Sequence, residues 1–129
     1  MIVDTSALLS VMLHEADRAR YRDAILAAPR PAISAANWLG GAIVLERRGD
    51  ATAAARYEPV CEALGLTIEP VTPSQAVLAR DAYRAFGRGR HPAGLNFGDC
   101  FAYALAKERD EPLLFKGEDF ARTDVKQAL

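Results

Sequence analysis

Short apolar runs alternate along the chain with longer segments whose apolar residues recur at helical spacing. The apolar runs are a few residues long, as is typical of buried strands, and lie at 1–4, 31–34, 66–71 and 113–115. Helical periodicity occupies the segments between them. We expect helices at 5–13, 15–28, 35–48, 51–64, a segment ending at 86, and 97–108.

Turn-forming residues mark the ends of these segments. Ser34, Asn96 and either Thr72 or Ser74 precede helical segments and are residue types that cap helix N-termini. Pro59 falls inside segment 51–64, and we expect it to kink or divide that helix.

The alternation of strands and helices predicts parallel strand pairing with right-handed crossovers. The expected fold class is therefore α/β, a three-layer α/β/α sandwich with a central parallel sheet. A chain of 129 residues suits one hydrophobic core, so we expect a single domain over 1–129. In such sheets the functional site lies at the carboxyl ends of the strands.

Composition limits the classes of partner. The formal net charge of −1 gives no bulk attraction for nucleic acid, so a site for a polyanion must be a local patch. The first residues lack a basic leader and an apolar stretch long enough to cross a membrane. Cys61 and Cys100 have no metal-ligand spacing. These features predict a cytoplasmic protein with reduced thiols and no membrane contact.

Acidic residues lie where the predicted strands end. Asp4 ends the first strand, Glu118 and Asp119 follow the last, and Asp99 lies in the first turn of the helix that Asn96 precedes. Each alone is more often a turn, capping or solvated residue. Together they predict a carboxylate cluster, whose mutual repulsion a divalent cation relieves. Oxygen ligands without His or Cys favour Mg²⁺ or Mn²⁺ over zinc.

Four segments, in order along nearly the whole chain, resemble the PIN domains of the VapC toxin group. They are Met1-Ile2-Val3-Asp4-Thr5-Ser6-Ala7-Leu8, Ile33-Ser34-Ala35-Ala36-Asn37-Trp38-Leu39, Leu95-Asn96-Phe97-Gly98-Asp99-Cys100-Phe101, and Leu113-Leu114-Phe115-Lys116-Gly117-Glu118-Asp119-Phe120 with Thr123-Asp124. Each motif is modest alone, and the four in register are specific.

The resemblance implies a PIN-like fold, an Mg²⁺- or Mn²⁺-dependent ribonuclease activity on RNA, a VapB-type antitoxin as partner and a homodimer. It implies that Asp4 and Asp99 are the main metal ligands. The last acidic position falls on Glu118 or Asp119, and the following Phe120 favours Asp119. The resemblance also implies that the hydroxyl of Thr5 or Ser6 holds a ligand or phosphate.

One position departs from the family pattern. A glutamate is expected in the helix after the second strand, and Gly40 stands there, followed by Gly41. Two adjacent glycines inside a helix cost about 1 kcal/mol each relative to alanine. Our interpretation is that Gly40 replaces a catalytic glutamate and weakens RNA cleavage. Neutral drift and a need for close helix packing are the alternatives.

Basic residues are candidates for contacts with the RNA backbone. We expect this role for Arg90, within a group that includes Arg84, Arg88 and His91, and for Lys116 beside the closing carboxylates. A solvated loop is the alternative. Arg18, Arg20 and Arg22 lie on the outer face of segment 15–28, either as an antitoxin contact or as an ordinary exposed helix face.

Two other classes of function compete with the nuclease. Gly40 is compatible with a nonenzymatic module that uses the same fold to bind an antitoxin or another partner. A phosphotransfer domain is a poorer match, because a haloacid-dehalogenase-like enzyme would have aspartate where Ser6 stands.

Overall fold

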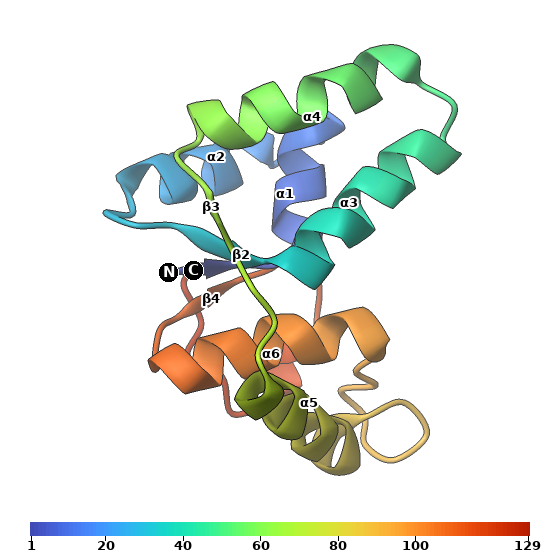
Figure 1. Ribbon diagram of the computed structural model, residues 1–129, viewed down its shortest axis with the longest axis vertical. Coiled ribbons are helices and arrows are strands. Elements are labelled where there is room, and N and C mark those ends of the chain that lie inside the picture. Colours follow the sequence, from blue (N-terminus) through green and yellow to red (C-terminus); the bar gives the residue numbers. More distant parts are fainter.

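The computed structural model describes residues 1–129 as a parallel sheet covered on both faces by helices (Figure 1). The strands β1 (Ile2–Val3), β2 (Ala32–Ser34), β3 (Thr67–Glu69) and β4 (Leu113–Leu114) lie in the order β3-β2-β1-β4. All neighbouring strands pair in parallel. The predicted α/β sandwich with a central parallel sheet is confirmed.

The helices form two layers. Figure 1 shows the first four on one face of the sheet and the last two on the other. Their bounds are α1 (Thr5–Met12), α2 (Arg18–Ala27), α3 (Ala35–Arg47), α4 (Ala51–Ala63), α5 (Pro73–Phe86) and α6 (Phe97–Arg109), with a short 3-10 turn, η1 (Phe120–Arg122), near the C-terminus. No helix is both long and apolar enough to cross a lipid bilayer.

The structure corrects the start of one helix and excludes the division of another. The second helix begins at Arg18 and not at Glu15, because Glu15 and Asp17 belong to a turn whose side chains reach Lys116. Pro59 lies inside α4 without dividing it. Proline has no N–H, so the backbone carbonyl of Ala55 lacks its usual helical donor. Both Ala55 and Pro59 are exposed, so water can donate to that carbonyl instead.

The helix caps follow the sequence in two of three cases. Thr72 accepts a hydrogen bond from the Gln75 N–H at 3.2 Å, and Asn96 accepts one from the Asp99 N–H at 2.9 Å. Ser34 makes no capping hydrogen bond at the start of α3, and its hydroxyl is buried without a partner. Ser34 therefore lies at the expected N-cap position but does not cap the helix through its side chain.

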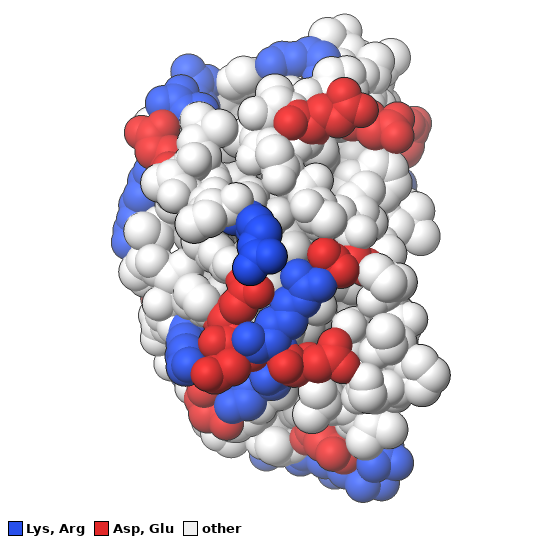
Figure 2. Space-filling model, turned by 60° about the vertical axis from the view of Figure 1, so that its left-hand side comes forward, with Lys and Arg blue, Asp and Glu red and all other residues white.

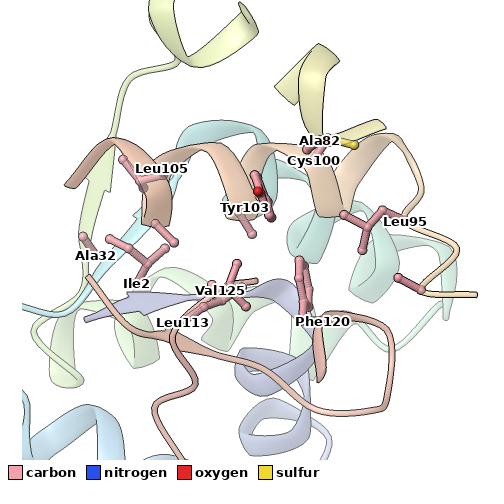
Figure 3. Close-up of a cluster of buried hydrophobic side chains, with 13 residues drawn as sticks. Ile2, Ala32, Ala82, Leu95, Cys100, Tyr103, Leu105, Leu113, Phe120 and Val125 are labelled. Atoms are coloured by element: carbon pink, nitrogen blue, oxygen red, sulfur yellow. The ribbon is translucent and has the colours of Figure 1, made fainter. Parts of the chain in front are cut away.

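The pleat of the strands divides the core into two clusters and aims the first carboxylate. Ile2, Ala32 and Leu113 face α6 in the cluster drawn in Figure 3. Val3, Ile33 and Leu114 belong to the cluster on the opposite face. Because successive residues of a strand alternate between faces, Asp4 points to the α6 side, as Ile2 does. The strand that builds the core therefore also positions the acid.

Candidate active site

Asp4 lies at the carboxyl end of β1 and caps α1. Its side chain is only 4% exposed. One carboxylate oxygen, Oδ2, accepts hydrogen bonds from the Ser6 N–H at 2.8 Å and the Ser6 hydroxyl at 2.5 Å. Burial raises the pKa of Asp4 in spite of these bonds, and the nearby charge of Asp119 raises it further.

Asp99 approaches Asp4 from the first turn of α6. Asn96 and Asp99 form a capping box, in which the Asn96 N–H donates to Oδ2 of Asp99 at 2.9 Å. The pKa of Asp99 is raised to about 6, chiefly by burial and then by the charges of Asp4 and Asp119. Arg88 and the Asn96 N–H act in the opposite direction. Asp4, Asp99 and Asp119 thus influence one another from three separate segments.

The last acidic position is better matched by Asp119 than by Glu118. The charge of Asp119 acts on both Asp4 and Asp99. Glu118 is exposed and lines a different hollow, beside Arg20 and Tyr21. Both residues are exposed, and the electrostatic influence on Asp4 and Asp99 is what favours Asp119, in line with the preference drawn from the neighbouring Phe120.

The two hydroxyls expected to hold a ligand are engaged within the protein. Thr5 Oγ1 donates to the backbone carbonyl of Asn37 at 2.9 Å. The Ser6 hydroxyl donates to Asp4 and accepts from the Lys116 N–H at 3.0 Å. Both residues therefore orient the site in this structure.

Asn37 is a residue of the site that the sequence analysis did not select. It is 3% exposed, and its Nδ2 donates to the carbonyl of Gly98 at 2.9 Å, beside Asp99. Through its own carbonyl it also holds Thr5, so it joins α1, α3 and α6 beside the carboxylates. Its Oδ1 is buried without a partner. The only signal in the sequence was a polar residue one turn before Gly40.

The two glycines of α3 have different surroundings. A Cβ atom at Gly41 would collide with the hydroxyl of Tyr57, which donates to the Trp38 carbonyl at 2.7 Å. A Cβ atom at Gly40 would meet only Thr5 Oγ1, at 4.0 Å. Gly41 thus permits close packing of Tyr57, whereas Gly40 leaves room for a side chain beside Thr5. The packing explanation applies to one glycine and not to the other.

The basic residues near the carboxylates are used unequally. The ammonium of Lys116 forms ion pairs with Glu15 and Asp17, at 2.9 Å from Oδ1 of Asp17, and these carboxylates neutralise its charge. Arg90 is exposed and lies over the ring of Tyr83, at 5.6 Å from the centroid. Arg88 is the cation whose charge lowers the pKa of Asp99. Of these three residues, only Arg88 therefore acts electrostatically on Asp99.

The donor set fits a hydrated divalent cation. No group of three or more His, Cys, Asp or Glu side chains is arranged to hold a metal ion. Magnesium usually takes one or two carboxylates and keeps several waters. Asp4 and Asp99 offer such a pair of oxygen donors, and their raised pKa values reflect burial and repulsion that a bound cation would offset.

Comparisons with known proteins identify the class of protein to which this parallel α/β sandwich, with acidic residues at its carboxyl edge, belongs. The family model described as the PIN domain matches residues 1–126. Ribonuclease VapC28 of Mycobacterium tuberculosis is 50% identical over 130 residues, which cover 100% of this chain and 98% of that protein. A ribonuclease VapC of Mycolicibacterium smegmatis is 43% identical over 125 residues, covering 97% of each.

Solved structures share the fold at low sequence identity. The Mycobacterium tuberculosis toxin VapC20, described as cleaving the sarcin-ricin loop, has a TM-score of 0.76 and 16% identity, covering 96% of this chain and 95% of that one. A toxin–antitoxin complex from Klebsiella pneumoniae has a TM-score of 0.70 and 18% identity, covering 95% and 92%. The chain belongs to the PIN-domain family and, within it, to the VapC ribonucleases.

The different surroundings of Gly40 and Gly41 generate a prediction about stability. Gly40→Ala should stabilise the protein by about 1 kcal/mol, because alanine favours the helix and its Cβ meets no close atom. Gly41→Ala should destabilise it, because Tyr57 must move and give up its hydrogen bond to Trp38. Chemical denaturation of the two variants measures both changes. Equal effects would mean that the helix is not packed as described.

The raised pKa of Asp99 predicts a dependence of stability on pH and metal. The folded state holds the Asp99 proton more tightly than the unfolded chain, so ionised Asp99 destabilises the fold above about pH 6, and this penalty disappears as pH falls towards 3.8. At pH 7 with chelator, Asp99→Asn should be more stable than the parent by about 1 kcal/mol, after allowance for partial exposure.

Thermal unfolding of the parent and Asp99→Asn from pH 7 to pH 5 measures this difference, which should shrink on acidification. Saturating Mg²⁺ should stabilise only the parent and reverse the order of the two melting temperatures. If the parent is more stable than Asp99→Asn in chelator at every pH, the claim that ionised Asp99 destabilises the fold is contradicted.

Proposed function

We propose that this chain is an Mg²⁺- or Mn²⁺-dependent endoribonuclease toxin whose activity is weakened by Gly40. The observation that carries the proposal is the pair of partly or fully buried carboxylates, Asp4 and Asp99, whose pKa values are raised, together with the open position at residue 40 beside Thr5, the residue that follows Asp4. Membership of the VapC ribonucleases supports RNA as the substrate.

The chain's own residues divide the work. Asp4 and Asp99 would hold the cation, which when bound activates water and stabilises the leaving oxygen of a phosphodiester. Ser6 fixes one oxygen of Asp4, while Asn37 and the capping box fix the start of α6 and with it Asp99. Arg88 is the basic group we assign to the scissile phosphate, in addition to the earlier candidate Arg90. Lys116 orients the acidic turn at Glu15 and Asp17.

Position 40 would complete this arrangement. A glutamate there would begin beside Thr5 and add a carboxylate that can accept a proton from the attacking water or ligate the cation. Gly40 supplies neither group. We therefore expect the chain to retain cation binding and to cleave RNA weakly.

The partners follow from family membership. A VapB-type antitoxin is the partner we propose, since VapC relatives and a toxin–antitoxin complex of the same fold support it. A loop of a structured RNA is the substrate class, because unpaired bases are accessible to recognition. An RNA substrate and two free cysteines, Cys61 and Cys100, support a cytoplasmic location.

A homodimer is also part of the proposal. An apolar hollow of about 470 Å³ between α5 and α6 supports it, with Phe97, 80% exposed, and Phe101 on its wall. Such an exposed apolar surface typically marks an interface. Phe97→Ser should shift the chain to monomer in analytical ultracentrifugation, whereas Val77→Ser, at an exposed apolar position of α5 that does not line the hollow, should not. A parent that sediments as a monomer contradicts the dimer.

Restoring a carboxylate at position 40 tests the nuclease directly. Gly40→Glu should cleave cellular RNA in Mg²⁺ or Mn²⁺ at least about a hundredfold faster than the parent, the lower range for a positioned acid or base. Gly40→Gln, which has the same length without the charge, should stay at the parent rate. Chelator, or Asp4→Asn in the Gly40→Glu background, should abolish the gain.

Other outcomes separate the alternatives. Equal metal-dependent cleavage by all three proteins would keep the nuclease but make a carboxylate at position 40 dispensable. If the Gly40→Glu protein, purified without an antitoxin, does not cleave cellular RNA, the nonenzymatic binding module is favoured.

A further inference from the structure

A second group of basic side chains lies away from the carboxylates, where the end of α1 meets α2 and α4. Figure 1 shows these three helices together on one face of the sheet. Arg18, Arg22, Arg56 and His14 surround a hollow of about 230 Å³ with an apolar floor. We call this the basic hollow.

The charges of the basic hollow are only partly balanced. Arg22 pairs with Asp23 at 2.8 Å, but Arg18 and Arg56 form no ion pair. The nearest acids in sequence to Arg18, Glu15 and Asp17, are instead held by Lys116. Two guanidinium groups from different helices are thus left without a counter-charge at one concave place. This arrangement suits an anion from outside the chain.

His14 gives independent evidence that donors meet here without enough acceptors. Its Nδ1 lies 2.7 Å from Nη1 of Arg18, and its Nε2 lies 3.3 Å from Nη1 of Arg56. A neutral imidazole accepts at one nitrogen only, so one guanidinium N–H faces a ring that cannot accept it. His14 also has φ of 55°, an uncommon backbone conformation for a residue with a side chain. An anionic oxygen would supply the missing acceptor.

We propose that the basic hollow binds a backbone phosphate of the RNA substrate; this assignment rests on the proposed function. A phosphate presents oxygens in several directions and can accept from planar guanidinium forks on two helices at once, whereas one carboxylate offers two oxygens in a plane.

The carboxylates and the basic hollow lie at opposite ends of α1, which has 8 residues and a length of about 12 Å at 1.5 Å per residue. A strand bound at the carboxylates would therefore place a more distant phosphate, and not the adjoining one, in the basic hollow.

The overall charge makes a local contact of this kind necessary. The net charge is −1, and on the face shown in Figure 2 basic and acidic groups lie interleaved without forming a broad basic field. Affinity for a polyanion must therefore come from a few places where cations are unpaired. The basic hollow is such a place.

Binding of a short fluorescent oligouridylate, measured by anisotropy in chelator so that no cleavage occurs, tests the proposal. The Arg18→Ala/Arg56→Ala variant should bind about tenfold more weakly than the parent at low salt. The slope of log affinity against log salt should become shallower by about 0.7, the value for one phosphate contact on a single strand. Arg47→Ala/Arg48→Ala, which removes the same charge from the exposed end of α3, should leave both quantities unchanged.

Further arms identify the source of the anion. Inorganic phosphate should compete with the oligouridylate for the parent only at much higher concentration, because it lacks the other contacts of a strand. Unchanged RNA affinity in the double variant overturns the proposal. Polyglutamate serves as a second competitor, standing for an acidic peptide. If the double variant loses affinity for inorganic phosphate alone, the hollow is a site for a small phosphate. If it loses affinity for polyglutamate alone, the hollow is a site for an acidic peptide.

The binding experiment is independent of catalysis. A Gly40→Glu variant that binds RNA through the basic hollow but does not cleave it would leave this inference intact while contradicting the nuclease. A variant with normal binding would do the reverse.

Discussion

The structure depends on holding ionisable carboxylates together at a partly buried edge of the sheet. Asp4 and Asp99 come from segments far apart in the chain, and burial opposes the charge of each. Ser6 and Asn96 offset part of the unfavourable free energy of these buried charges by donating hydrogen bonds to the two carboxylates. The remainder is available to a cation, because binding one removes the repulsion that folding creates. In the metal-dependent nuclease that we propose, this electrostatic cost would be the source of metal affinity.

Asn37 maintains the geometry on which this electrostatic cost depends. Its side chain holds Gly98 at the start of α6, and its backbone carbonyl holds Thr5 at the start of α1. The starts of two helices that carry or follow the acids are thus fastened to a third helix. The same helix carries Gly40, so a side chain restored there would enter an arrangement that is already fixed.

Local patterns predicted much of this molecule. The short apolar runs identified the strands, and the pleat that buries Ile2 and Val3 on opposite faces also determines the direction of Asp4. Asn96 and Thr72 were recognisable as caps because capping depends on residues close in sequence.

Features that depend on contacts between distant segments could not be predicted in the same way. Lys116 is paired with Glu15 and Asp17, about a hundred positions earlier, so its use within the protein was hidden. Tyr57 explains Gly41 and leaves Gly40 unexplained by packing, a distinction that two identical neighbouring residues cannot reveal. Asn37 and the basic hollow likewise depend on how the helices meet.

The pKa of the Asp99 carboxyl, measured by ¹³C NMR with and without Mg²⁺, tests the central claim most directly. The structure predicts a pKa of about 6 in chelator and a marked decrease when Mg²⁺ is added, because the positive charge of the cation stabilises the ionised carboxylate of Asp99. A pKa near 3.8 in chelator, or a raised value that Mg²⁺ does not change, would contradict the account.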